Sequence, residues 1–402
     1  METLHEPIWR KAGIFEAIKA STYKILKNES LVLALVEKWC PETKSFVFPW
    51  GEATITLEDV MLLLGFSVLG SSVFDPLESS KMRDSVEKLE RVRQRNMDTS
   101  CRVIQERWSL VFRNRDDHME HEAFLALWLS HFVFPDKSRR SVSKNVLPIA
   151  VRLARGERIV LATSVLASLY RDLDQIRDKS TRNANLKSLF KLVQVWAWER
   201  FKNIRPKAKE IPIGEPRISR WGGLQKKSKK VRLNLDDFDW RPYTKPLKNW
   251  SPRLVYVEDA MWVTIDNSIY DEFIAFARCV RSSQLVGIGF VEDYYPNRVA
   301  MQLGLAQDLP GLVTHHSDFT EKEAWDDYNK SLYGLNLYMP SRLATTSVTA
   351  RYRDWWLKSV SKFYGYEETF NASNRIDDVS PKVLSLCQVL QKLGGGFPAK
   401  FK

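Results

Sequence analysis

The chain has 402 residues, of which 44% are hydrophobic and 12% aromatic, so a globular protein of one large or two ordinary domains is expected. Its formal net charge of +12 favours acidic partners, with nucleic acid the first candidate. Four scattered cysteines without a CxxC pair argue against a zinc site and a disulfide framework: Cys40, Cys101, Cys279 and Cys387. The sequence has no apolar signal core and no run of about 20 apolar residues, which argues against a membrane span. Cytosol or nucleus is therefore expected.

The first 38 residues predict two amphipathic helices. The first is centred on Trp9, Ile14, Phe15 and Ile18, and the second on Leu31, Leu33, Leu35 and Val36. Both lead directly into residues 39–70, the stretch around which the rest of the chain is expected to pack.

Aromatic residues alternate with other types along residues 45–50 of that stretch, and Gly51-Glu52 separates this run from residues 54–57. The pattern predicts a short aromatic β-hairpin. Thr56 then precedes Asp59 by three residues, which predicts a capping box at the start of a helix that Gly65 closes in a left-handed conformation. Because this helix is apolar on every face, later segments are expected to wrap it.

Helices dominate the chain as far as residue 201. A surface helix with one buried stripe is predicted at residues 81–96, and a core helix stopped by Pro135 at residues 121–134. Two more helical regions are predicted, at residues 149–174 with an interruption at Gly156 and at residues 186–201. The expected fold class is therefore mainly α, a single large helical domain with a short aromatic hairpin near the N-terminus and a few minor strands.

The composition changes after residue 202. Residues 205–232 hold ten Lys/Arg against Glu210 and Glu215, with several Pro and Gly, which predicts an exposed, partly disordered connection. Irregular or short extended structure is expected at residues 238–243 and 254–257. A helix follows at about 270–281, then a short apolar run at 285–291, and the segments 298–305 and 352–364 close the fold.

These segments predict a domain over residues 1–393, with an N-terminal helical half at 1–202, a basic connecting segment at 203–250 and a C-terminal half at 251–393. A basic tail covers residues 394–402.

The order of several sequence blocks resembles the plant mobile domain family, which is also described as aminotransferase-like and includes Maintenance of Meristems-like proteins. The most distinctive block is residues 48–60 with Gly65 after it, and its motif residues are Phe48, Pro49, Trp50, Gly51, Glu52, Thr56, Asp59 and Gly65. Weaker blocks lie at residues 121–134, 153–156, 196–201 and 298–304. The resemblance covers residues 5 to 365 approximately.

The resemblance implies a mostly helical, non-catalytic nuclear module that acts in transposable-element silencing, genome stability and meristem maintenance. It implies a protein partner, with a protein phosphatase 7-type phosphatase as the named candidate on a separate chain, and DNA or RNA as a further candidate partner. The family has no established catalytic residues, so none is assigned here, and no cofactor is expected. The alternative is a transposase-derived or element-encoded metal-dependent enzyme acting on nucleic acid.

The basic segment supplies the candidate contacts for nucleic acid or for nuclear import: Arg217, Arg220, Lys226, Lys227, Lys229, Lys230 and Arg232. A solvated basic loop explains the same run equally well. Aromatic residues near this run (Trp221, Trp240, Tyr243, Trp250) and in a later block (Tyr352, Trp355, Trp356) are the types that stack on bases, but they are more often core residues in so aromatic a chain.

The best metal-like cluster is at residues 116–122, where His118 and His121 are spaced to share a helix face. Acidic residues at the start of a helix explain the same pattern, and His315-His316 with Asp318 is a weaker match, so no metal site is predicted. Scattered carboxylates are available to a transposase-like site, but no spacing singles out a set: Asp236, Asp237, Asp239, Glu292, Asp293 and Asp318. No phosphate-binding loop or pyridoxal phosphate site is recognisable.

Overall fold

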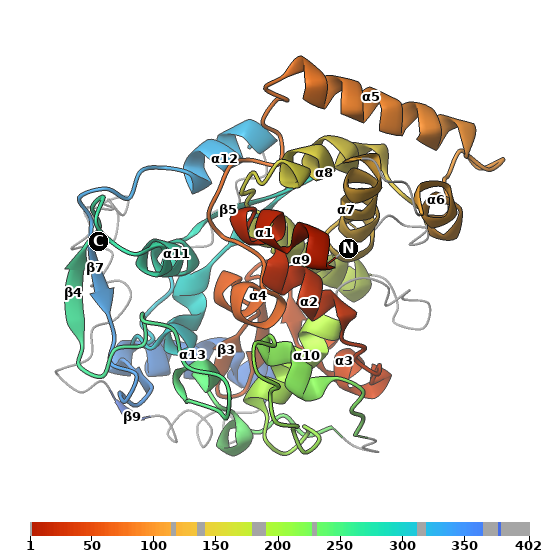
Figure 1. The fold of residues 1–402 in the computed structure, drawn as a ribbon. Helices are drawn as coiled ribbons and strands as arrows, with labels where there is room; N and C mark the ends of the chain where they lie inside the picture. Colours follow the sequence, from red (N-terminus) through yellow and green to blue (C-terminus); the bar gives the residue numbers. More distant parts are fainter. Residues whose placement is uncertain are drawn as a thin grey trace.

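Helix α4 (Leu57–Leu64) lies near the centre of the computed structural model, which describes residues 2–113, 118–134, 141–178, 190–226, 231–311, 319–364 and 377–378 (Figure 1). The predicted capping box is present, because the Thr56 hydroxyl accepts from the Asp59 N–H and the Asp59 carboxylate accepts from the Thr56 N–H. Gly65 ends the helix with φ of 72°. A Cβ atom at this position would lie 2.6 Å from the Glu16 Cβ, so the glycine also lets α2 approach closely.

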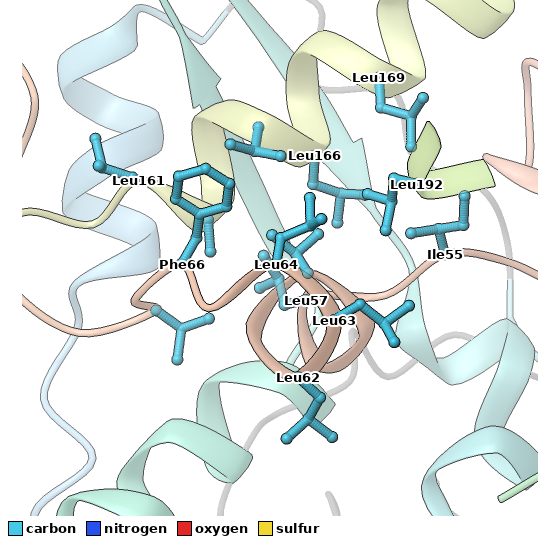
Figure 2. Packing of buried hydrophobic residues seen from close by; sticks show 14 of the residues in the cluster. Ile55, Leu57, Leu62, Leu63, Leu64, Phe66, Leu161, Leu166, Leu169 and Leu192 are labelled. Carbon is cyan, nitrogen blue, oxygen red and sulfur yellow. The ribbon is translucent and has the colours of Figure 1, made fainter. Parts of the chain in front are cut away.

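Every residue of α4 except Met61 is buried. The helix contacts α2 (Phe15–Thr22), α9 (Ala162–Asp178), α10 (Phe190–Arg200) and α11 (Asp271–Val280). Figure 2 shows Leu57, Leu62, Leu63 and Leu64 of this helix in one buried cluster with Phe66, Leu161, Leu166, Leu169 and Leu192. The expectation that later segments wrap this helix is confirmed.

Helices provide most of the regular structure, which confirms the mainly α fold class. The remaining α-helices are α1 (Glu2–Lys11), α3 (Glu29–Val36), α5 (Ser80–Arg95), α6 (Gln105–Phe112), α7 (His118–Phe132), α8 (Leu147–Ala154), α12 (Glu321–Tyr328) and α13 (Ala350–Tyr364). Short 3-10 helices are η1 (Lys144–Val146), η3 (Arg217–Trp221), η4 (Leu235–Asp237), η5 (Pro242–Thr244) and η6 (Pro296–Leu303). Within the described ranges no helix is long and apolar enough to cross a membrane.

The N-terminal region holds three helices, so the prediction of two was wrong. Gly13, with φ of 68°, interrupts the apolar pattern that was assigned to one helix and separates α1 from α2. The next helix, α3, begins where the Asn28 side chain accepts the Leu31 N–H. Side-chain periodicity alone did not reveal the break at Gly13.

The strands form small antiparallel pairs, with one exception. They are β1 (Trp39–Cys40), β2 (Ser45–Phe48), β3 (Gly51–Ala53), β4 (Met261–Thr264), β5 (Ser283–Gly287), β6 (Phe290–Tyr294), β7 (Asn336–Met339), β8 (Ser347–Val348) and β9 (Asp377–Asp378). Strands β1, β2 and β3 form one sheet, β4 pairs with β7, β5 pairs with β6, and β8 pairs with β9 in parallel. The apolar run predicted at residues 285–291 is the centre of the β5–β6 hairpin.

The aromatic hairpin is present, but its turn was placed too late in the chain. Strand β2 pairs with β3, so Pro49 and Trp50 form the turn, and Gly51 and Glu52 belong to the second strand. Proline has no N–H to donate to a strand ladder, which fits a ladder that ends at Phe48. The residues after β3 leave the sheet, because the Thr54 backbone bonds to the Gln302 side chain instead.

The middle helices match most predictions. Helix α5 has one buried stripe, formed by Met82 and Leu89. Helix α7 ends at Phe132, and Pro135, which was expected to stop it, lies outside the described residues. The interruption at Gly156 is real, since this residue has φ of 79° between α8 and α9.

The prediction that the basic segment is an exposed connection was wrong for its η3 part. This helix turns back onto the core, with Ile218 and Trp221 both 0% exposed, whereas residues 212–214 before it are exposed as predicted. Arg217 and Arg220 of this helix pair with the buried Glu199, which explains why a stretch rich in cations, proline and glycine packs against the core. Residues 227–230 lie outside the described residues.

Candidate functional site

The acidic residues of the motif block find basic partners far away along the chain. Asp59 accepts from Arg200 at 2.9 Å and from the Tyr243 hydroxyl at 2.6 Å, and both members of the Asp59–Arg200 ion pair are 0% exposed. Arg200 also donates to the Trp240 carbonyl at 2.6 Å. This network joins the N-terminus of α4 to the C-terminus of α10.

A second ion pair joins the hairpin to the 298–304 block. Glu52 accepts from Arg298 Nε at 2.9 Å and from the Ser45 hydroxyl at 2.6 Å. Four residues further on, Gln302 accepts from the Thr54 N–H at 2.7 Å and donates to its carbonyl at 2.8 Å. The 298–304 block therefore holds Glu52 of the second hairpin strand and Thr54, the residue that follows that strand.

A third network explains the buried part of the basic segment. Glu199 accepts from Arg217 at 2.8 Å and 3.1 Å, from Arg220 at 3.4 Å and from the Trp221 indole at 2.7 Å. Burial alone would raise the pKa of the Glu199 carboxyl, but the two guanidinium groups lower it. Two of the residues predicted to contact nucleic acid, Arg217 and Arg220, are thus paired with a buried carboxylate.

Two other candidate contacts of the basic segment, Lys226 and Arg232, lie nearer the surface. Lys226 donates to the Asn203 carbonyl at 2.5 Å, and Arg232 is exposed. Lys227, Lys229 and Lys230 lie outside the described residues. A role of this segment in import or nucleic-acid binding stays a prediction.

The aromatic candidates are mostly core residues, as expected. Trp221, Trp240 and Tyr243 are buried, and Trp250 is half-buried with the Arg217 guanidinium 4.3 Å from its ring centre. In α13, Tyr352 and Trp356 are buried, and the Trp356 indole donates to the Pro49 carbonyl at 3.0 Å. Trp355 is half-buried and packs against this core.

The histidine cluster at residues 116–122 is only partly described. His121 is buried, accepts a hydrogen bond from the Trp9 indole at 2.9 Å, and stacks on His5 with ring centres 3.7 Å apart. Its neighbour Glu122 pairs with Arg155 of the 153–156 block at 2.7 Å. Asp116, Asp117 and the His118 side chain lie outside the described residues, as do His315, His316 and Asp318.

The remaining carboxylate candidates do not converge. Glu292 accepts from Lys44 Nζ at 2.6 Å, and the same ammonium bonds Asp174 at 2.6 Å, so a tethered cation already neutralises this pair. Asp239 pairs with Lys245 at 2.5 Å. Asp236 and Asp237 belong to η4, whereas Asp293 lies on β6. In the part of the chain that the structure describes, no three His, Cys, Asp or Glu side chains lie together as a metal site.

One open groove, with a volume of about 240 Å³, lies between the α1–α2 corner, the end of α4 and the start of α11. Its charged lining consists of Arg10, Glu16, Arg158, Arg253, Asp271 and Glu272. These charges largely neutralise one another, because Arg158 pairs with Asp271, and Arg253 lies 3.8 Å from Glu272. The lining combines matched charges with apolar side chains, which suits binding better than covalent chemistry.

Glu58 is an ionisable residue of the 48–60 block, and the sequence did not reveal its buried environment. Burial raises its pKa to about 7, and the neighbouring Asp59 charge adds to the effect, while the Tyr256 hydroxyl donates to Glu58 at 2.8 Å. Glu58 therefore holds its proton in the folded chain at a pH where an exposed glutamate has lost it.

The raised pKa predicts pH-dependent stability. Between about pH 4.5 and pH 7 the folded chain binds a proton at Glu58 that the unfolded chain has released, so the free energy of unfolding falls as the pH rises, by about 3 kcal/mol. Below this window both states are protonated and the stabilisation is complete. Glu58→Gln cannot ionise and should remove this part of the slope. Urea unfolding at pH 5 and pH 8 measures it, with the exposed Glu87→Gln as control. Equal slopes in wild type and Glu58→Gln would contradict the assignment.

Comparisons with known proteins match a range that includes the sequence blocks whose residues form these buried ion pairs. The family model described as "Plant mobile domain" matches residues 13–357. The chain is 28% identical over 329 residues to a serine/threonine-protein phosphatase 7 long form homolog of Arabidopsis thaliana, covering 74% of this chain and 23% of the relative. It is 28% identical over 305 residues to Protein MAIN-LIKE 1 (70% and 55%) and 26% identical over 307 residues to Protein MAINTENANCE OF MERISTEMS (71% and 59%), both of the same plant. The chain thus spans between about a quarter and three fifths of the length of these relatives. No solved structure matches it.

Proposed function

This chain belongs to the plant mobile domain family, and from that premise we propose that it is a non-catalytic nuclear interaction module. It acts through protein partners in transposable-element silencing, genome stability and meristem maintenance. The observation that carries the proposal is that the acidic residues of the blocks that resemble the family form ion pairs inside the fold. Glu52, Asp59 and Glu199 all pair with arginines inside the fold.

Catalytic groups must reach a substrate, and these motif residues are instead 0% or 1% exposed. Asp59 and Glu52 find their partners in other blocks that resemble the family: Arg200 in residues 196–201 and Arg298 in residues 298–304. Glu199 pairs with Arg217 of the basic segment. The shared sequence pattern thus encodes a scaffold, and the surface of that scaffold is left to contact partners.

The partner named first is a protein phosphatase 7-type phosphatase on a separate chain. Support comes from the phosphatase 7 long form homolog, whose matching region is 23% of its own length. The nuclear assignment rests on the family and on the basic charge of the chain, which suits residence near nucleic acid.

Two measurements on the purified chain test the proposal. Calorimetric titration with a protein phosphatase 7-type phosphatase should show saturable binding. Incubation with labelled DNA and RNA, with and without Mg²⁺, should leave the strands intact. Cleavage that depends on Mg²⁺ would favour the transposase-derived enzyme instead, and the absence of phosphatase binding would remove that partner.

The basic segment gives a further prediction. Replacing Lys226, Lys227, Lys229 and Lys230 with alanine should weaken nucleic-acid binding and flatten its salt dependence, by about 0.9 in the logarithmic slope for each phosphate that the variant no longer neutralises. Electrophoretic mobility shifts across a salt series measure both effects. Binding identical to that of the wild type would show that these four lysines do not touch nucleic acid and would leave nuclear import or a solvated basic loop as the explanation.

A further inference from the structure

We propose that the exposed side of α5 and its corner with α6 bind the phosphate backbone of duplex DNA. We call this surface the α5–α6 rim, and its exposed cations are Lys81, Arg83, Lys88, Arg91, Arg95, Arg102, Arg107 and Arg113. The inference goes beyond the proposed function, which requires only a protein partner. The inference rests on the proposed function in one respect, because the choice of DNA as the ligand depends on the proposed nuclear location.

Helix α5 has the exposure that such an interaction requires. Figure 1 shows it as the outermost element at the top of the view, beyond α7 and α8. Only Met82 and Leu89 of its 16 residues are buried, and its packing partner is mainly α8. One narrow side of the helix therefore holds it to the body, and the opposite side faces solvent along about 24 Å.

Three of the exposed cations form a straight row. Lys81, Lys88 and Arg95 are seven residues apart, so they lie on one face of the helix and repeat about every 10.5 Å. A rigid row of this kind meets the regular charge of a duplex backbone without ordering a flexible loop. Binding then displaces condensed counterions wherever a cation meets a phosphate.

The row keeps a net positive charge. Two of the three acidic residues of α5 pair elsewhere, Glu87 with Arg91 and Glu90 with Arg93, and the third, Asp84, is exposed one turn from both Lys81 and Lys88. No carboxylate within the described ranges pairs with Lys81, Lys88 or Arg95. By contrast, Arg217 and Arg220 of the basic segment pair with Glu199.

The row continues around the corner into α6. Arg107 donates to the Asn96 side chain at 3.2 Å, which fixes α6 beside the end of α5. Asp98 is occupied by backbone N–H groups of the connecting turn, and Arg102 and Arg113 remain exposed. Exposed cations thus lie on both helices, which meet where Arg107 contacts Asn96.

The chemistry of the rim favours a duplex over a single strand. Proteins that hold single strands present aromatic side chains on which bases stack. Across residues 79–113 the aromatic side chains are Trp108 and Phe112, and both are buried. The exposed apolar residues of the rim are Ile104 and Leu110, which are aliphatic. The surface offers positive charge but no exposed aromatic side chain for bases to stack on. This suits a duplex, in which the bases are paired and the phosphates face outward.

The test compares a variant that lacks the three cations of the row with a control variant that lacks three exposed cations elsewhere. The rim variant is Lys81→Gln, Lys88→Gln and Arg95→Gln. The control variant, Lys245→Gln, Lys248→Gln and Lys358→Gln, also removes three exposed positive charges but lies outside the rim and outside residues 205–232. Binding of the full chain to a 20-base-pair DNA duplex, the same single strand and an RNA duplex is measured by fluorescence anisotropy from 50 to 300 mM salt. Thermal unfolding checks that both variants fold.

We expect the rim variant to lose about two to three from the logarithmic salt slope and about tenfold or more in DNA affinity at 50 mM salt, with the control close to wild type. The proposal is overturned by equal losses in the two variants, by an unchanged rim variant or by a wild type that binds no duplex. Binding of the single strand or of the RNA duplex as tight as that of duplex DNA also overturns it. Calorimetric titration of the rim variant with the phosphatase, carried out in parallel, reports on the proposed function separately.

Discussion

Replacing Arg200 with methionine lowers the free energy of unfolding by about 3–5 kcal/mol, because the substitution leaves the buried Asp59 carboxylate without its cation. Both side chains are 0% exposed, so water cannot take the place of the guanidinium. The Trp240 carbonyl loses its donor as well. Asp59 keeps only the Tyr243 hydroxyl and the Thr56 hydrogen bonds of the α4 cap.

Urea unfolding measures this loss, with Arg158→Met as the matched control. Arg158 also pairs with an aspartate, Asp271, but the pair is exposed, 41% and 64% for the two side chains. An exposed pair of this kind contributes at most about 1 kcal/mol. A double variant that also replaces Asp59 with asparagine should recover part of the loss, since the unpaired charge is then removed. Similar losses for Arg200→Met and Arg158→Met would show that burial does not decide the effect.

Replacing Trp50 with alanine should cost about 3–5 kcal/mol, because the ring fills the centre of an aromatic cluster and its removal leaves a cavity. Trp50 is 3% exposed and stacks on Phe48 with ring centres 4.5 Å apart. It meets Phe238 at 4.9 Å and Trp240 edge-on at 5.4 Å. The hairpin turn is thereby fixed to the segment that follows η4.

Trp50→Phe separates ring volume from hydrogen bonding. The Trp50 indole N–H is buried without an acceptor in the described structure, so phenylalanine removes an unsatisfied donor together with part of the ring. Its cost should therefore be less than half that of alanine. Tyr333→Ala, at a side chain 66% exposed, serves as the control for loss of an aromatic residue. An alanine variant that unfolds at the wild-type urea midpoint would contradict the cavity argument.

Local patterns predicted the centre of the fold well. The Thr56–Asp59 capping box and the left-handed Gly65 were predictable because each depends on residues within one helical turn. The burial of α4 followed from its apolar faces. The hairpin turn was misplaced because the sequence did not show that Thr54 leaves the sheet. Thr54 bonds the Gln302 side chain instead, and the two residues are 248 positions apart.

The charged interior was not predictable from local patterns, for a related reason. A glutamate and an arginine at positions 199 and 200 look like surface residues until their partners at 217 and 59 are known. Composition alone placed Arg217 and Arg220 in an exposed strip, and the buried Glu199 reverses that assignment for these two residues. The exposed cations of α5 were visible in the sequence, but their row is meaningful only once the helix is seen to project from the body.

The pairing of Glu52 with Arg298 has a consequence for the order in which the protein is made. The two residues are 246 positions apart, and a ribosome adding about 5 to 20 residues per second needs roughly 10 to 50 s to cover that distance. During this interval the aromatic hairpin has been synthesised but lacks Arg298, which pairs with Glu52, and Gln302, which bonds the Thr54 backbone. An unpaired strand edge with an apolar face readily binds other chains. Newborn chains are therefore expected to need chaperone protection in the interval between synthesis of the hairpin and synthesis of Arg298.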